Sequence, residues 1–201
     1  EHGAEMARYK TMFRTGAMLK TWERLLNPRA YFLVSGGSSP LGTVGFVNAA
    51  FELRRQIDEG MMPEPQYLVC PLGSNGTMAG LQLGCLLAGL RTEVIGVRVL
   101  ADSIGPWAIA TPGTVASLIR KTYRMLRRAS PDIPDIVIPV PRILNDYFGS
   151  GYGSPTPEGV EALGILQETE NVRLEATYTA KTFAAVLDLV RKPSRPDDVV
   201  L

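Results

Sequence analysis

The feature that most constrains the fold of this chain is a unit of apolar strand, glycine-rich turn and helix that occurs twice. In the first unit the strand is predicted at residues 31–35 and the helix at about 41–58. In the second unit the strand is predicted at 67–70 and the helix at 77–90. Strands that alternate with helices of this length are typical of an α/β fold, in which an open parallel sheet carries helices on both faces.

The rest of the chain continues this alternation. Apolar spacing and capping residues predict further helices at 4–26, at 114–128, from Thr156 onward and at 179–190. Short apolar runs predict further strands at 93–99, 135–140 and 174–177. The segments 101–113 and 141–157 are rich in Gly and Pro, which predicts loops.

Composition excludes several classes of partner. The 201 residues are 45% apolar, enough for one or two domains with a full core, and the net charge is +1. No basic cluster goes beyond a pair such as Arg127-Arg128, so we expect neither nucleic acid nor an anionic membrane surface as a partner. We find no apolar run of about 18 residues and no signal-peptide pattern at residues 1–5, so we expect a cytoplasmic protein.

The soft metal ligands are few. Two cysteines, Cys70 and Cys85, do not make a disulfide framework for a domain of this size. With one histidine, His2, the chain has no ligand set for structural zinc. We therefore expect no metal site and no histidine base.

The second glycine turn is a candidate anion site. Backbone N–H groups at a helix N-terminus attract anions, and glycines let a ligand approach the backbone closely. The turn consists of Gly73, Ser74, Asn75, Gly76 and Thr77. Its pattern is neither a Walker sequence nor a dinucleotide fingerprint, which leaves one small phosphate group as the ligand. A tight turn without any ligand fits the spacing equally well. The first turn has Pro40 where a donor would be useful, which favours a structural or hinge role.

Four stretches, taken together and in order, resemble one family. They read GGSSPLG at 36–42, GSNGTMAG at 73–80, DYFGSGYG at 146–153 followed by PTPEG at 155–159, and TYTAK at 177–181. This set resembles the pyridoxal-phosphate enzymes that comprise D-cysteine desulfhydrase and 1-aminocyclopropane-1-carboxylate deaminase, of the tryptophan synthase β-like fold (fold type II).

The resemblance implies roles for particular residues. It implies that the amides of the second turn hold the phosphate of pyridoxal 5'-phosphate, and that Tyr152 and Tyr178 are catalytic and face the cofactor and substrate. A phenol can relay a proton if the site lowers its pKa. Without the resemblance, Tyr152 reads as a loop aromatic on the core and Tyr178 as an aromatic at a strand end.

Thr179 helps to distinguish the desulfhydrase-like branch of the family from the deaminase branch. The deaminase branch carries Glu at this position and the desulfhydrase-like branch carries a hydroxyl residue. A carboxylate beside the ring nitrogen would favour its protonated form, and a neutral hydroxyl would not. Thr179 therefore points to β-elimination of a thiol, which needs a weaker electron sink than opening a cyclopropane ring. The position fits a simple helix N-cap as well.

The family's Schiff-base lysine has no counterpart among the five lysines, which are Lys10, Lys20, Lys121, Lys181 and Lys192. We therefore expect a fragment, incomplete at both ends, that is inactive alone. Residues 1–40 would be a remnant of the smaller domain, and 41–201 the larger cofactor-binding domain. The intact parent is expected to be a homodimer.

The parent is thus predicted to release pyruvate, ammonia and sulfide from a small amino-acid substrate such as D-cysteine. The alternatives are 1-aminocyclopropane-1-carboxylate deaminase, a non-catalytic α/β module that binds a phosphate ligand, and a nucleotide-binding α/β domain, which the glycine spacing disfavours.

Overall fold

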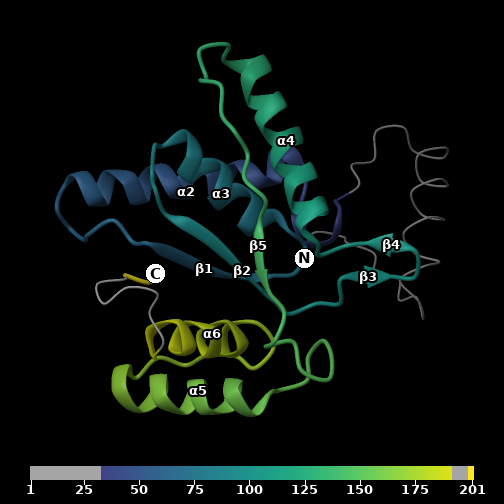
Figure 1. Ribbon diagram of the computed structural model, residues 1–201, viewed down its shortest axis with the longest axis vertical. Coiled ribbons are helices and arrows are strands. Elements are labelled where there is room, and N and C mark those ends of the chain that lie inside the picture. Colours follow the sequence, from purple (N-terminus) through teal and green to yellow (C-terminus); the bar gives the residue numbers. More distant parts are fainter. Residues whose placement is uncertain (1–32, 192–198) are drawn as a thin grey trace, which may run out of the picture. The chain divides into compact units, whose positions relative to one another are not determined.

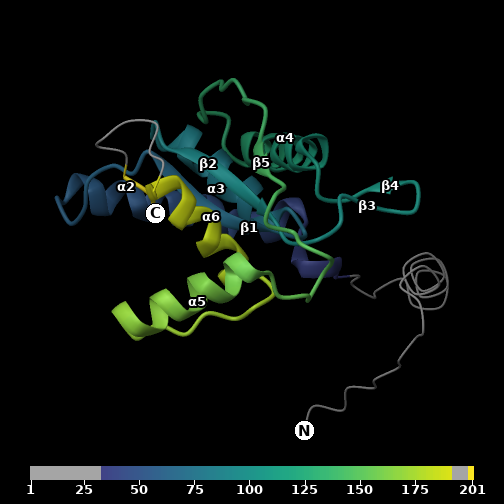
Figure 2. The same cartoon turned by 60° about the horizontal axis from the view of Figure 1, so that its bottom comes forward.

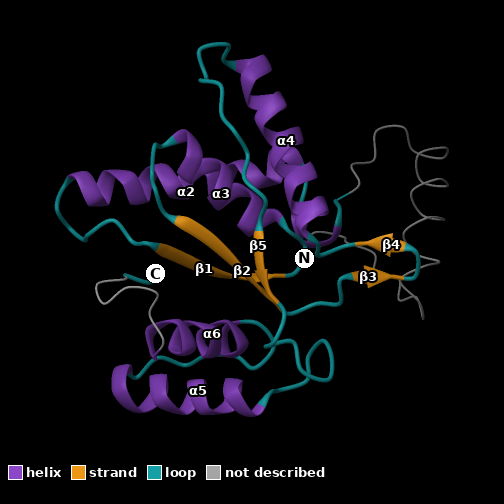
Figure 3. Cartoon of the chain, viewed as in Figure 1, coloured by secondary structure: helices purple, strands orange, loops and turns teal. Residues whose placement is uncertain are grey.

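The computed structural model describes residues 33–191 and 199–201, and its unit Ser35–Leu201 has the predicted α/β fold (Figures 1 and 3). Its helices are α2 (Pro40–Asp58), α3 (Gly76–Leu87), α4 (Pro112–Ala129), α5 (Pro157–Glu170) and α6 (Thr179–Arg191). Its strands are β1 (Tyr67–Leu72), β2 (Glu93–Arg98), β3 (Ser103–Ile104), β4 (Trp107–Ala108) and β5 (Arg142–Leu144). No helix of these residues is long and apolar enough to span a bilayer.

The main sheet is parallel, with the strand order β1-β2-β5. Tyr67 pairs with Glu93 at one end of β1 and Leu72 with Arg98 at the other. The last described residues lie beside β1, where the Leu201 N–H donates to the Tyr67 carbonyl at 2.8 Å. Strands buried on both faces read as continuous apolar runs, which is why β1 and β2 could be recognised from the sequence.

Helices cover both faces of the sheet. Helix α3 packs on β1 and β2 and is covered in turn by α2 and α4, whereas α6 contacts β1 and β2 and carries α5 outside it. Figure 2 shows α5 and α6 on the side of the sheet away from α3. The expectation of helices on both faces is confirmed.

Glycines bring α2 and α3 into close contact. A Cβ on Gly80 would lie 2.5 Å from the Cβ of Phe46, and one on Gly84 would lie 2.5 Å from the Val47 carbonyl oxygen. Gly45, on α2, has no such neighbour within 4 Å. This packing brings the N-termini of α2 and α3 to the edge where β1 ends.

Three predicted strands differ from the structure. Residues 135–140 form no strand, and β5 begins at Arg142, because prolines at 134, 139 and 141 lack the N–H that a ladder needs. Val137 and Val140 are 88% and 85% exposed, so their apolar side chains pack on nothing that would hold a strand there.

The other two predicted strands are turns or irregular. In 31–35, Ser35 starts a 3-10 turn (Ser35–Gly37), and residues 31 and 32 lie outside the described residues. Residues 174–177 lead into α6 without pairing, because the Glu175 carboxylate binds the N–H groups that follow it. The expected loop 101–113 contains the hairpin β3–β4. The helix predicted at 4–26 lies outside the described residues.

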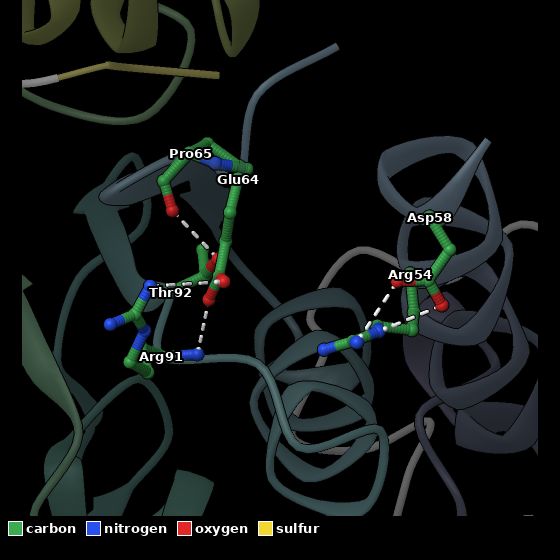
Figure 4. Close-up of polar contacts among 6 residues, drawn as sticks. All are labelled: Arg54, Asp58, Glu64, Pro65, Arg91 and Thr92. Atoms are coloured by element: carbon green, nitrogen blue, oxygen red, sulfur yellow. Dashed lines mark hydrogen bonds and ion pairs between the residues drawn. The ribbon is translucent and has the colours of Figure 1, made fainter. Parts of the chain in front are cut away.

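Hydrogen bonds connect the two segments that lead into β1 and β2 (Figure 4). The Glu64 carboxylate accepts the Arg91 N–H at 2.5 Å, and the Thr92 hydroxyl donates to the Pro65 carbonyl at 2.7 Å. Arg54 and Asp58 pair nearby on α2. These contacts tie the segment before β1 to the segment before β2.

Candidate functional site

The two glycine turns meet at the edge where β1 ends. The hydroxyl of Ser38 donates to the Ser74 hydroxyl at 2.8 Å and accepts the Gly76 N–H at 3.2 Å. Gly36 has a φ of +66°, and a Cβ there would lie 2.1 Å from the Ser74 hydroxyl oxygen. The first turn therefore supports the second turn directly, and both need a residue without a side chain where they touch.

At the N-terminus of α3 the Ser38 hydroxyl accepts the first N–H, that of Gly76, and the side chain of the N-cap residue accepts none. This N-cap residue, Asn75, has a φ of 74°, a left-handed conformation that Asn tolerates better than most residues. The Asn75 side chain instead donates to the Ile109 carbonyl at 2.7 Å, in the segment that leads into α4. The first N–H groups of a helix have no partner within it and lie at the positive end of its dipole. This end of α3 can therefore receive an anion.

Two tyrosines lie beside this turn. The Cε1 atom of Tyr178 is 3.8 Å from the position that a Cβ on Gly73 would take. The hydroxyls of Tyr178 and Tyr152 are 2.5 Å apart, and their rings are edge to face with centroids 5.9 Å apart. The fold thus brings together the second glycine turn, Tyr152 and Tyr178, which are separated widely in the sequence.

Tyr178 holds its proton at neutral pH. The hydrogen bond with Tyr152, with burial as a smaller cause, raises the pKa of Tyr178 to about 12. A phenol with so high a pKa is a weak acid. By itself Tyr178 can donate a hydrogen bond to a ligand at the turn, and a positive charge nearby would be needed for it to release its proton.

Thr179 and Glu175 form the start of α6. The Glu175 carboxylate accepts the N–H groups of Tyr178 at 2.5 Å and of Thr179 at 2.7 Å. The Thr179 hydroxyl accepts the Glu175 N–H at 2.8 Å and donates to its carbonyl at 3.1 Å. Within the residues that the structure describes, this hydroxyl forms its hydrogen bonds with Glu175 and not with the second glycine turn.

Glu175 was missed by sequence reasoning. Burial of its carboxylate acts to raise the pKa, but the three N–H groups that it accepts outweigh this and lower the pKa below its ordinary value. An acidic residue shortly before a predicted helix was the available signal. Glu175 sets where α6 begins and hence where Tyr178 lies.

Lys181 was also overlooked, except as a lysine that does not match the family's Schiff-base position. Its side chain is fully buried on α6, and its ammonium donates to the carbonyls of Phe148 at 2.8 Å and Gly151 at 3.2 Å. No feature of the sequence indicates this, because both carbonyls belong to a distant loop. The amine is engaged and is not free to react.

Comparison with known proteins gives a family and a fold. The family model described as pyridoxal-phosphate dependent enzyme matches residues 1–201. A D-cysteine desulfhydrase of Klebsiella pneumoniae (strain 342) is 32% identical over 173 residues, which cover 85% of this chain and 48% of that protein. A putative 1-aminocyclopropane-1-carboxylate deaminase of Thermotoga maritima is 29% identical over 167 residues, with 83% and 49% covered.

A solved structure described as the ACC deaminase homologue superposes with a TM-score of 0.77 at 23% sequence identity. The match covers 98% of this chain and 57% of that one, and it confirms the expected fold. The chain spans about half the length of the curated relatives it matches.

Proposed function

Because this chain belongs to the family of pyridoxal-phosphate-dependent enzymes, we propose that the natural protein carrying it is a lyase that removes the β substituent of a D-amino acid such as D-cysteine. The overall reaction consumes one water and gives pyruvate, ammonia and hydrogen sulfide. The observation that carries the proposal is the N-terminus of α3, where the N-cap Asn75 makes no cap hydrogen bond, beside the Tyr152–Tyr178 pair. Relatives that are named D-cysteine desulfhydrase support the choice of substrate.

The cofactor phosphate is assigned to the backbone amides of residues 73–77. The fit rests on the N-cap residue Asn75, whose side chain makes no cap hydrogen bond, and on the lack of a Cβ at Gly73, which leaves the backbone there accessible. Bound there, pyridoxal phosphate would supply an electron sink for charge that develops on the substrate. The amides orient the group, and the helix dipole offsets its negative charge.

Tyr152 and Tyr178 are assigned the proton chemistry. Their hydroxyls are 2.5 Å apart beside Gly73, so one donates a hydrogen bond to the other. A positive charge on the bound ligand would lower the phenol pKa towards neutral pH, so that the pair could exchange a proton with the substrate. Thr179, a neutral residue at the start of α6, supports β-elimination rather than ring opening, because it offers no carboxylate.

The branch is tested with full-length protein and two substrates. With D-cysteine we expect pyruvate, sulfide and ammonia in equal amounts. With 1-aminocyclopropane-1-carboxylate we expect little or no four-carbon 2-oxo acid. Efficient ring opening without pyruvate formation would contradict the desulfhydrase assignment in favour of the deaminase.

The tyrosine roles are tested by removing one hydroxyl. We expect Tyr178→Phe to lower kcat with D-cysteine by about 10²–10⁴-fold, the range for loss of a proton-transfer group. The matched control is Tyr123→Phe, which removes a phenol that donates to the Pro134 carbonyl on another part of the fold. Equal activity of both variants would remove Tyr178 from the mechanism.

A non-catalytic module that binds a phosphate-bearing ligand is the second candidate, since the N-terminus of α3 would serve it equally. Binding of pyridoxal phosphate by the full-length protein without pyruvate release from any amino acid would favour it. Failure to bind pyridoxal phosphate or phosphate at millimolar concentrations would count against both functions.

The remaining assignments concern the whole protein. Residues 1–40 are assigned to the smaller domain and 41–201 to the larger one, and the 201-residue chain alone should not turn over substrate, because none of its lysines matches the Schiff-base position. Cys70 and Cys85 are both free and buried, which supports a reducing, cytoplasmic location. The low net charge argues against a nucleic-acid partner. Light scattering of the full-length protein tests the expected homodimer.

A further inference from the structure

Lys181 is the largest side chain that is fully buried in the described residues. A buried ammonium is costly unless hydrogen bonds replace its water shell, and here two backbone carbonyls do so. The Phe148 ring lies 5.5 Å from the ammonium and adds a cation–π contact. Burial lowers the pKa of this amine, while the Glu175 carboxylate acts in the opposite direction. Because the Lys181 ammonium is buried and engaged, we examine which parts of the chain it holds in place.

The two carbonyls belong to the loop that presents Tyr152. Gly151 immediately precedes Tyr152, and Phe148 lies at the start of the same bend, where Gly149 has a φ of +68°. Lys181 itself lies on α6, three residues after Tyr178. One side chain therefore connects the segment that bears Tyr178 to the segment that bears Tyr152.

A second contact joins the same loop and helix but leaves Tyr152 out. The Tyr147 hydroxyl donates to the Asp188 carboxylate at 2.8 Å, about two turns further along α6. This contact shares the two elements with Lys181 but does not reach Gly151. It therefore offers a control for any general loosening of the loop.

We propose that Lys181 is a positioning residue whose ammonium, by holding the Gly151 carbonyl, keeps the Tyr152 hydroxyl against that of Tyr178 beside the second glycine turn. Without the ammonium, the carbonyls of Phe148 and Gly151 would lose their donors in a partly buried place, and the loop would shift to bring them to water. Such movement would separate the two phenols. The inference rests on the proposed function only in taking this pair as the one that serves the reaction.

The test follows the titration of Tyr178 in full-length protein that carries ¹³C at the tyrosine ring carbon bonded to oxygen. Tyr178→Phe identifies the resonance. In Lys181→Met we expect the pKa of Tyr178 to fall from about 12 towards its ordinary value of 10, as it should in Tyr152→Phe. Lys181→Met should add nothing further in the Tyr152→Phe background, whereas Tyr147→Phe should leave the titration unchanged.

The outcomes separate positioning from stability alone. A Tyr178 titration that is unchanged in Lys181→Met, or one that Tyr152→Phe also leaves unchanged, would overturn the inference. An equal shift in Tyr147→Phe would do so too, because it would indicate general loosening. If Lys181→Met does not fold, Lys181→Gln takes its place; it keeps one amide donor and should give a smaller shift. The titration needs no substrate, so an inactive protein with the expected shifts would refute the lyase and leave the role of Lys181 standing.

Discussion

The two glycine turns follow one plan and end differently. In the first turn the Ser39 hydroxyl accepts the Gly42 N–H at 3.1 Å, and Pro40 at the start of α2 has no N–H to satisfy. In the second turn the N-cap residue Asn75 makes no cap hydrogen bond and turns its amide away towards Ile109, and only the Gly76 N–H is accepted, by Ser38. A glycine turn followed by a helix therefore does not by itself make an anion site. The residue at the N-cap decides whether the helix end is already satisfied.

The start of α6 is a third helix N-terminus beside Tyr178, and it extends the comparison. Here the chain supplies its own anion, since the Glu175 carboxylate accepts N–H groups of Thr177, Tyr178 and Thr179. The chain's own groups thus serve the ends of α2 and α6. At α3 they supply only the Ser38 hydroxyl, which accepts the Gly76 N–H, and the next N–H groups are left to a ligand. Substitutions at four positions, with Gly60 as a control, test this contrast.

The largest effect is expected where the two turns touch. Gly36→Ala places a methyl 2.1 Å from the Ser74 hydroxyl oxygen at a left-handed φ, so we expect the free energy of unfolding to fall by about 2–4 kcal/mol. Gly60→Ala is the control, because Gly60 has a φ of +72° and no neighbour within 4 Å; strain alone should cost about 1–2 kcal/mol. Urea unfolding measures both. Equal losses would mean that the turns do not support one another.

The next largest effect is expected at Asn75 in the second glycine turn. Asn75→Gly keeps the left-handed backbone available, whereas Asn75→Ala strains it by about 1–2 kcal/mol, so we expect the alanine variant to bind pyridoxal phosphate roughly tenfold more weakly than the glycine variant. Titration followed by absorbance gives the two dissociation constants. If they agree, the conformation of Asn75 does not shape the anion site.

A substitution in the first glycine turn should lower the stability of the fold and leave cofactor binding unchanged. Ser39→Ala removes the cap of α2, and we expect the free energy of unfolding to fall by about 1 kcal/mol with an unchanged Kd for pyridoxal phosphate. Thermal unfolding and the same absorbance titration measure the two quantities. Weaker cofactor binding would place the first turn in the binding site and erase the contrast.

The smallest effect is expected at α6. The pKa of Glu175 is lowered in the folded state, so its contribution to stability is present above its ordinary pKa of 4.5 and is lost as the pH falls through the lowered value. Glu175→Gln should flatten this acid dependence of the unfolding free energy. The change should be a few tenths of a kcal/mol, because the residue is exposed. Urea unfolding at a series of acidic pH values measures it, and identical slopes for both proteins would contradict the role of Glu175 as a cap.

Much of the fold could be predicted because it depends on local patterns. The buried strands β1 and β2 are continuous apolar runs, and Thr156-Pro157 marks the start of α5 by capping chemistry. The prediction at 135–140 failed because an apolar run was given more weight than the prolines within and around it. The second glycine turn was a candidate from its composition, but its spacing also fits a turn that binds nothing.

By itself the sequence determined the α/β class, the order of most helices and strands, and the residue types of a candidate phosphate site, because periodicity, turn chemistry and caps act over a few residues. Only the tertiary structure decided that Tyr152 meets Tyr178, that Ser38 supports the second turn, and that Lys181 is buried against the loop of Phe148 and Gly151. These contacts join residues 26 to 38 positions apart in the sequence. They form only when packing has brought the elements together, and so no local pattern encodes them.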